Sequence, residues 1–298
     1  MKKLSAPARC VKELRHIAEA GAAYGFYWLF RLLPLDAASA LGGMFGRNLG
    51  PLTAAHKVAL RNIRRTFPDM PAERAEEIAL GMWENLGRTA GEFPHVPSFD
   101  LDRRVAMTGA DIIEKAGKTV PGTIFFTAHL GNWELLPTLT AKHGAPVTAV
   151  YRRMNNPYVD ALVKKTRLRA NAVACVPKGR EGARDLLTAV RSGKCICMLT
   201  DQKMNDGIAA SFMGREAMTA PAIAHFALKY GCALAPMRVL RVKGCRFSCD
   251  VMEPLDIGAD KLVPPDEKSV VEAVNRVYEE WIRSNPEQWF WVHRRWPD

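Results

Sequence analysis

One stretch of the chain decides the fold: Thr123-Ile124-Phe125-Phe126-Thr127-Ala128-His129-Leu130-Gly131-Asn132-Trp133-Glu134. Its first six residues form a short apolar run that is typical of a buried strand. The pattern from Trp133 onward predicts a helix. His129 is therefore expected on a strand-to-helix turn, which is where open α/β sheets usually place their chemistry.

The stretch also sets a histidine and a carboxylate, His129 and Glu134, five positions apart. On one regular helix that spacing would swing the two side chains apart by roughly 140°, but a turn at Gly131 can bring them together. The carboxylate can then hold one ring nitrogen while the other takes a proton from a hydroxyl. An isolated pair of this kind is most often structural, so the prediction depends on its placement and on the flanking segments.

The rest of the chain alternates between strand-like and helical patterns. Strand-like runs occupy 122–128, 146–152, 194–200, 232–242 and 246–253. Helical patterns occupy 132–142, 156–171, 180–191, 219–230 and 266–284. This alternation predicts an α/β fold with a mixed, mostly parallel sheet flanked by helices. The short turn at 243–245 predicts that the last two strands form an antiparallel hairpin at the sheet edge.

The sequence pattern of the first 66 residues predicts helices, part of which associate with a membrane. Arg15 and Arg31 flank an apolar segment, but its clean part, 20–30, is shorter than the roughly 20 residues of a membrane span. Its tyrosines and tryptophan favour a membrane-surface helix or a marginal span, and a buried soluble helix is the alternative. We therefore divide the chain into an N-terminal helical membrane-associating region, 1–66, and an α/β domain, 67–298.

Composition limits the possible partners. The 298 residues have a net charge of +11, which favours anionic lipid, nucleic acid or an acidic protein without choosing among them. The seven cysteines contain no C-x-x-C pair, which indicates reduced, mostly buried thiols in a cytosol-facing protein. Nucleotide-binding glycine motifs, a G-x-S-x-G elbow and metal-ligand spacing are absent from the sequence, so we predict no metal site.

Several blocks of sequence together resemble one family, the bacterial lipid A biosynthesis (late) acyltransferases. The block AHLGNWEL (128–135) is similar to its active-site motif. The other similar blocks are NIRRTFPD (62–69), WENLGRTAGEF (83–93), VYRRMNNP (150–157), TDQ (200–202), SFMGREAMTAPA (211–222) and PEQWFWVHRRW (286–296). They occur in the family's order from about residue 15 to the end. The family belongs to the wider glycerolipid acyltransferase group, whose members have a His-x4-Asp or His-x4-Glu motif.

The resemblance implies that His129 is the general base and Glu134 its partner. Asn132 and Arg152 are expected to bind substrate, with backbone N–H groups at the Gly131–Asn132 turn or Arg152 stabilising an oxyanion. The chain has Arg153 where the family pattern leads us to expect proline. That change leaves open which of the two arginines faces a phosphate or a thioester.

Two further residues, Asp201 and Gln202, end a strand-like run and are also expected in the substrate-binding part of the site. For Asp201 the alternative is a helix N-cap. For Arg152 the alternative is a salt bridge to Asp201 or to another carboxylate.

The function implied by the resemblance is transfer of a fatty acyl group from an acyl carrier protein thioester to a hydroxyl of a lipid A precursor, in lipopolysaccharide biosynthesis. No cofactor is expected. The expected partners are acyl carrier protein, anionic membrane lipid and the glycolipid acceptor, without nucleic acid. The expected location is the cytoplasmic face of a bacterial inner membrane.

Three alternatives remain open at this point. The first alternative changes only the acceptor: a related acyltransferase with the same motifs would act on another glycolipid or on a lysophospholipid. A thioesterase-like hydrolase would use water as the acceptor. A non-catalytic basic protein would bind a membrane or nucleic acid without turnover.

Overall fold

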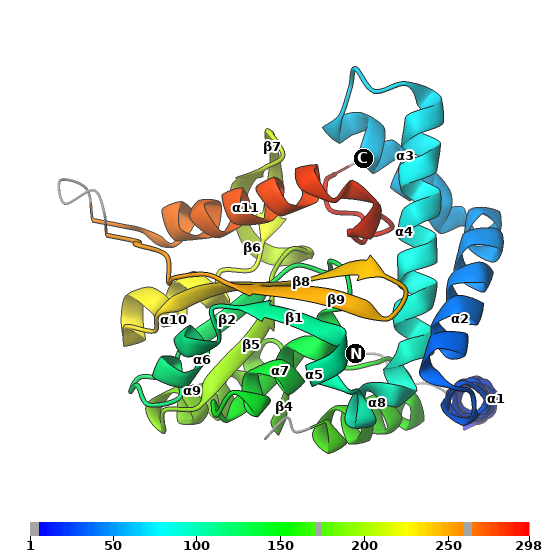
Figure 1. Cartoon of the computed structure of the whole chain (residues 1–298), viewed down its shortest axis with the longest axis horizontal. Coiled ribbons are helices and arrows are strands. Elements are labelled where there is room, and N and C mark those ends of the chain that lie inside the picture. The colour runs from blue at the N-terminus through cyan, green and yellow to red at the C-terminus, as the bar shows by residue number, and fades with distance from the viewer. Residues whose placement is uncertain (1–5, 171–173, 259–263, 298) are drawn as a thin grey trace.

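A mostly parallel sheet lies at the centre of the computed structural model, which describes residues 6–170, 174–258 and 264–297 (Figure 1). Within those residues the sheet has seven strands in the order β1-β9-β8-β2-β5-β3-β4, and every pairing is parallel except β8 with β9. The strands are β1 (Val105–Thr108), β2 (Ile124–Thr127), β3 (Val147–Tyr151), β4 (Ala174–Pro177), β5 (Cys195–Leu199), β8 (Leu234–Lys243) and β9 (Arg246–Val251).

Helices flank the sheet, as the sequence predicted. They are α1 (Ala6–Leu32), α2 (Leu35–Leu49), α3 (Ala54–Thr66), α4 (Ala72–Glu92), α5 (Leu101–Arg104), α6 (Ala110–Ala116), α7 (Leu136–Lys142), α8 (Pro157–Arg169), α9 (Arg180–Arg191), α10 (Ala222–Tyr230) and α11 (Glu267–Ser284). Short 3-10 turns occur at η1 (Gly50–Leu52), η2 (Phe93–Ser98), η3 (Trp133–Leu135) and η4 (Pro286–Gln288). A separate two-stranded hairpin consists of β6 (Lys203–Phe212) and β7 (Arg215–Thr219).

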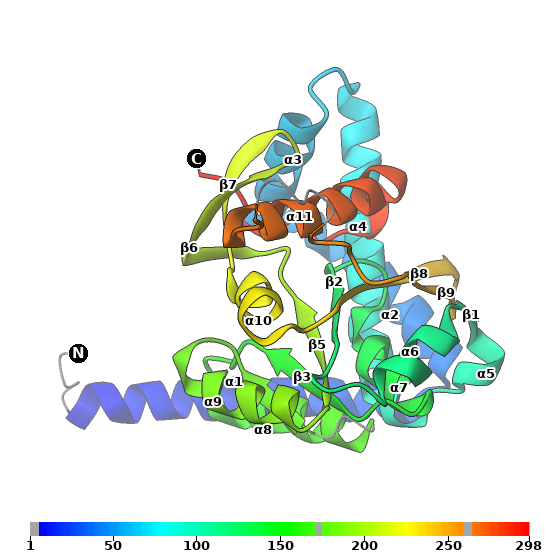
Figure 2. The same ribbon diagram turned by 90° about the vertical axis from the view of Figure 1, so that its left-hand side faces the viewer.

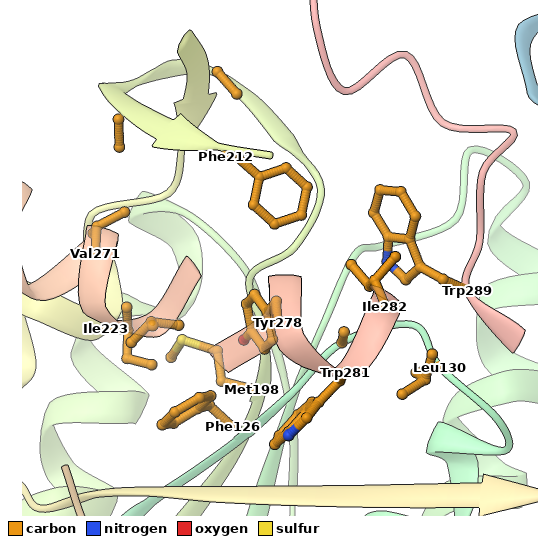
Figure 3. Close-up of a cluster of buried hydrophobic side chains, with 14 of the residues drawn as sticks. Phe126, Leu130, Met198, Phe212, Ile223, Val271, Tyr278, Trp281, Ile282 and Trp289 are labelled. Carbon is orange, nitrogen blue, oxygen red and sulfur yellow. The ribbon is translucent and has the colours of Figure 1, made fainter. Parts of the chain in front are cut away.

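An apolar cluster covers each face of the sheet. Successive side chains of a strand point to opposite faces, so neighbouring residues of β2 belong to different clusters. Phe126 of β2 packs with residues of α10 and α11 in one cluster (Figure 3). Its neighbour Phe125 packs on the other face with residues of α6 and α7. A strand buried on both faces needs a continuous apolar run, which is the pattern that identified β2 in the sequence.

The sequence did not reveal every strand. Strands β1 and β4 have only four residues each, which is too short for a clear period. The β6–β7 hairpin was also missed, although its tip at Met213 and Gly214 has two positive φ angles of the kind favoured in tight hairpin turns. The prediction that β8 and β9 form the sheet edge was wrong, because β1 pairs with β9 and lies outside it.

The N-terminal region is helical, as predicted. Helices α2 and α4 pack at very close range, since a Cβ placed on Gly42 or Gly46 of α2 would collide with the backbone of α4. Helix α1 lies along α8 (Figure 2), where Asn156 donates to the backbone carbonyl of His16. Among the helices of the described residues, none has an apolar stretch long enough to cross a bilayer.

The turn after β2 has a conformation that requires glycine. Gly131 has a φ of +58°, and an added Cβ would collide with the carbonyl oxygen of Val239. The carbonyl of Gly131 accepts hydrogen bonds from Asn85 (2.9 Å) and Thr89 (3.2 Å) of α4. The N-terminal helices therefore fix the turn that follows His129.

We expect the Gly131→Ala variant to lose about 2–5 kcal/mol of unfolding free energy. The left-handed backbone costs about 1–2 kcal/mol and overpacking about 1–3 kcal/mol. The control is Gly144→Ala, because Gly144 has a φ of +84° but open space around its Cβ position, so only the backbone cost applies. Equal losses in chemical denaturation would contradict the close approach at Gly131.

Candidate active site

His129 meets Asp201 because the strands before them are in register. Thr127 of β2 pairs with Leu199 of β5, so the residues two positions further along stand opposite each other. The Nδ1 atom of His129 lies 2.7 Å from Oδ1 of Asp201, and the backbone N–H of His129 donates to Oδ2 at 2.8 Å. The carboxylate thus fixes both the backbone and the ring of the histidine.

The Asp201 carboxylate is fully enclosed, with 1% of its surface exposed. A third donor, the indole N–H of Trp289, reaches Oδ2 at 2.8 Å. Burial alone would raise the pKa of Asp201, but the charge and hydrogen bonds of His129 and the Trp289 bond hold that pKa below its ordinary value. An ionised carboxylate only accepts hydrogen bonds, so Nδ1 of His129 holds a proton, and in the neutral ring Nε2 is the nitrogen that has the lone pair.

The unprotonated Nε2 nitrogen is on the side of the ring away from Nδ1 and Asp201. His129 lines a cavity of about 870 Å³ together with Gln202, whose amide N–H donates to Nε2 at 3.4 Å. Gln202 therefore lies beside His129, at the site. An imidazole with an unprotonated nitrogen, on a cavity wall, is suited to take a proton from a bound hydroxyl.

The predicted hydrogen bond between His129 and Glu134 is not formed, and this prediction is corrected. Glu134 instead accepts two hydrogen bonds from Arg167 of α8, at 2.6 and 2.8 Å, and one from the Trp133 indole at 3.2 Å. Burial alone would raise the pKa of Glu134, but the charge and bonds of Arg167 outweigh it and lower that pKa. The turn at Gly131 therefore directs this carboxylate toward α8.

Asn132 is buried and is not one of the residues that line the cavity. Its Oδ1 accepts from the backbone N–H of Glu134 (3.2 Å), and its amide donates to Glu92 of α4 (2.7 Å). This geometry supports a role in holding the turn and not the predicted contact with substrate. Asp201 is likewise not one of the lining residues, and it contacts His129, which is one.

The alternatives considered for Arg152 and Asp201 are both wrong. Asp201 is bonded to His129 and Trp289 and caps no helix, and it forms no salt bridge with Arg152. Arg152 and Arg153 both line the cavity, and Arg153 pairs with Glu181. Arg152 is thus the one of the two whose charge is not matched by a described carboxylate.

The cavity lining has an apolar group and a cationic group of side chains. The apolar part includes Leu186 and Leu187 of α9, Met198 of β5, and Phe226 and Tyr230 of α10. The cations are Arg152, Arg153, Arg167, Lys178 and Arg184. Among the described residues, no group of three or more His, Cys, Asp or Glu side chains is arranged to hold a metal ion.

The C-terminal segment, 286–296, contributes more to the site than the sequence suggested. Trp289 holds Asp201, and the backbone N–H of Phe290 donates to the carbonyl of His129 at 3.1 Å. The aromatic ring of Phe290 lies 5.9 Å from the His129 ring. The density of tryptophans in this segment was a signal of its importance, and the segment packs against the domain, with Trp289, Trp291 and Trp296 buried.

A histidine at the end of a central parallel strand is thus held by a buried acid on the wall of a largely apolar cavity. A comparison with known protein families identifies the family of this chain. The model of the bacterial lipid A biosynthesis acyltransferases matches residues 9–298, and the chain belongs to this family.

Individual relatives cover most of both chains. The lipid A biosynthesis palmitoleoyltransferase of Escherichia coli K12 is 25% identical over 283 residues, which are 91% of this chain and 88% of the relative. The lipid A biosynthesis lauroyltransferase of the same organism is 26% identical over 286 residues, 91% and 89% of the two chains. A lipid A biosynthesis acyltransferase of Haemophilus influenzae is 25% identical over 291 residues, 95% and 83% of the two chains.

The C-terminal His293 makes stability depend on pH. Burial lowers the pKa of His293 to about 4, and its Nε2 accepts the backbone N–H of Lys203 at 2.9 Å. An unfolded histidine titrates near 6.5, so between about pH 6.5 and pH 4 the unfolded chain binds a proton that the folded chain does not. We expect this residue to reduce unfolding free energy by up to about 3 kcal/mol as pH falls to 4.

The measurement compares wild type with His293→Gln by chemical denaturation from pH 8 to pH 4.5. At pH 8 His293 is neutral in both the folded and the unfolded chain, so the difference in unfolding free energy between the two proteins reports packing alone. As pH falls through 6, the wild type should lose more unfolding free energy than His293→Gln does. Parallel curves over the whole range would rule out a titration effect of His293.

Proposed function

We propose that the protein transfers a fatty acyl group from an acyl carrier protein thioester to a hydroxyl of a lipid A precursor, with His129 as the general base. The observation that supports this most is the His129 ring, held through Nδ1 by Asp201 with Nε2 on the wall of an apolar cavity. Family membership supports the acyltransferase class and the lipid A acceptor.

In the proposed reaction the acceptor hydroxyl gives its proton to Nε2 of His129 as its oxygen attacks the thioester carbonyl carbon. The tetrahedral intermediate then collapses, the C–S bond breaks, and the leaving thiolate takes the proton back from His129. Asp201 stabilises the imidazolium that exists between these two events. No nucleophile from the protein is needed.

The negative charge on the intermediate needs a donor fixed in advance. The N–H of Gly131 already donates to the carbonyl of Gln288 at 3.2 Å, so it is not free for this role. Arg167 lines the same cavity as His129 and is held by the two hydrogen bonds that it donates to Glu134. We propose that Arg167 stabilises the oxyanion and that Glu134 acts by positioning it.

The cavity and the overall charge fit the proposed substrates. The apolar lining would stabilise a fatty chain by about 0.8 kcal/mol for each buried CH₂ group. An acidic carrier protein would be attracted by a chain with a net charge of +11. The same charge would favour anionic lipid at the proposed location, the cytoplasmic face of the inner membrane.

Helix α1 offers a surface for that membrane. On a helical projection, all but one of the large exposed apolar residues of α1 lie within an arc of about 140°, and no Asp, Glu, Lys or Arg of residues 9–32 lies in that arc. The exception is Phe26, which is exposed and lies outside the arc. The arc faces away from the buried side that includes Tyr27 and Phe30. The large exposed side chains inside the arc are Val11, Leu14, Ile17, Tyr24, Trp28, Leu29 and Leu32. An uncharged helical face of this kind lies in the interface plane of a bilayer.

The central test incubates purified protein with acyl carrier protein bearing a fatty acyl group and a tetra-acylated lipid A precursor, with products measured by mass spectrometry. We expect a mass gain of one acyl group. His129→Ala and Asp201→Asn should each reduce the rate by about 10²-fold or more, since general base catalysis contributes about 10²–10⁴. Thermal unfolding of Asp201→Asn separates lost chemistry from lost stability.

The matched control is Asp185→Asn on the exposed side of α9, which should retain the wild-type rate. Full activity of a folded His129→Ala protein would refute the proposed base. Free fatty acid without acylated lipid would indicate a hydrolase. Salt-sensitive DNA binding without turnover would favour the non-catalytic alternative.

Membrane association is tested by sedimentation with vesicles of phosphatidylethanolamine and phosphatidylglycerol. Leu29→Glu places a charge inside the uncharged arc of α1 and should reduce the bound fraction strongly. Val242→Glu adds the same charge at an exposed valine of β8 and should not. Equal binding by both variants would exclude the α1 face as the membrane contact.

A further inference from the structure

Helix α8 contacts the active site with one face and α1, which lies along it (Figure 2), with another. On the first face, Arg167 lines the cavity and donates two hydrogen bonds to Glu134. These bonds use Nε and Nη2, and the remaining nitrogen, Nη1, makes no hydrogen bond with a described residue. The guanidinium therefore keeps N–H groups available for a ligand, and its place in the cavity depends on the position of α8.

Asn156 ties the start of α8 to α1. Its side-chain oxygen caps α8 by accepting from the backbone N–H groups of Tyr158 (3.1 Å) and Val159 (3.4 Å). Its amide nitrogen donates to the backbone carbonyl of His16 (2.8 Å) and to the carboxylate of Glu19 (3.0 Å), both on α1. Asn156 is buried, so one side chain both begins α8 and fixes it on α1.

A second tie lies next to Arg167 in the chain. The hydroxyl groups of Thr166 and Tyr27 are hydrogen-bonded at 3.3 Å, and both side chains are buried. Tyr27 belongs to the inner face of α1, where buried residues occur at helical spacing, at positions 16, 20, 27 and 30. A movement of α1 against α8 would therefore shift the backbone from which Arg167 projects.

Small shifts of Arg167 matter because transition-state stabilisation depends on geometry. A donor stabilises an oxyanion at about 3 Å, and a misplacement of about 1 Å can cost on the order of 10²-fold in rate. The carbonyl of Ala170, which follows α8, accepts from Thr138 of α7 at 2.9 Å. Loss of the α1 contacts would thus leave α8 attached at its end but less restrained along its length.

The helical state of α1 is the property that a lipid surface can influence. Of residues 9–19, His16 is the only one that is buried, and the N-terminal turns of α1 project beyond the rest of the molecule (Figure 2). A helix with so little tertiary packing is marginal in water. A bilayer on the outer, apolar face binds the helical form and stabilises it by mass action. The same helical turns present the His16 carbonyl to Asn156.

We propose that α1 couples a lipid surface to the active site, with Asn156 and Thr166 as positioning residues that hold α8, and with it Arg167, in place. The inference rests on the proposed function, in which α1 binds the bilayer and Arg167 stabilises the oxyanion. A bilayer on the outer face of α1 then raises the rate through the contacts of its inner face.

The first test is a double-mutant cycle across the contact, measured as kcat of acyl transfer on vesicles. Tyr27→Phe and Thr166→Val each remove one hydroxyl group and keep the side-chain shape. Each should lower kcat about fivefold, the value of one hydrogen bond, with KM for the acyl donor unchanged. The double variant should lose no more than either single variant, and Thr166→Ser, which keeps the hydroxyl, should retain the wild-type kcat. Losses that multiply in the double variant would overturn the coupling.

The matched control is Thr188→Val on α9. The hydroxyl of Thr188 donates to the carbonyl of Arg184 one turn earlier (3.0 Å), as that of Thr166 does to the carbonyl of Leu162 (3.0 Å). Thr188 is exposed and forms no hydrogen bond with the described part of α1. This variant should keep the wild-type kcat. A loss equal to that of Thr166→Val would show that removal of a helical hydroxyl suffices, and it would overturn the role of the α1 contact.

Hydrogen exchange read by mass spectrometry tests the coupling without turnover, so it remains decisive even if the protein transfers no acyl group and the proposed function fails. Vesicles of phosphatidylethanolamine and phosphatidylglycerol should slow exchange in residues 157–169 of the wild type about fivefold or more. Exchange in α11 should be the same with and without vesicles.

Asn156→Asp sharpens the exchange test, because aspartate keeps the cap of α8 but cannot donate to α1. This variant should bind vesicles as the wild type does, without slower exchange in α8. Absence of slowing in the wild type, or equal slowing in Asn156→Asp, would overturn the inference.

Discussion

The buried carboxylate of Asp201 is the group on which the rest of the site depends. Taking an ionised carboxylate out of water costs several kcal/mol unless donors replace the lost hydration. Here the donors come from His129, twice, and from Trp289. The hydrogen bonds to this one charge therefore join the end of β5, the turn after β2 and the C-terminal segment. They also favour the neutral imidazole tautomer in which Nδ1 holds the proton and Nε2 does not.

A second buried charge secures the same turn from the opposite side. Glu92 at the end of α4 is fully buried, pairs with Arg241 of β8, and accepts the amide of Asn132. A buried pair of this kind is costly to break, because the remaining charge would be left unmatched. The helices that precede the sheet are thus part of the site's framework, since α4 supplies the groups that hold the turn.

The cavity combines two environments that suit an amphiphilic molecule. Its apolar walls come from α9, α10 and β5, while its cations follow the ends of β3 and β4 or lie on α8 and α9. Parallel strands bring their carboxyl ends to one edge of the sheet, so the base and the cations that follow β3 and β4 share that edge.

The sequence by itself determined the α/β class, the strand before His129 and the turn at Gly131, because apolar runs, helical periods and glycine turns are local patterns. It also placed Arg152, Asp201 and Gln202 at strand ends. Only the tertiary structure decided which carboxylate orients the histidine. Glu134 is five residues away and turns to Arg167, whereas Asp201 is 72 residues away. That choice depends on β5 lying beside β2 in register, which no local pattern encodes.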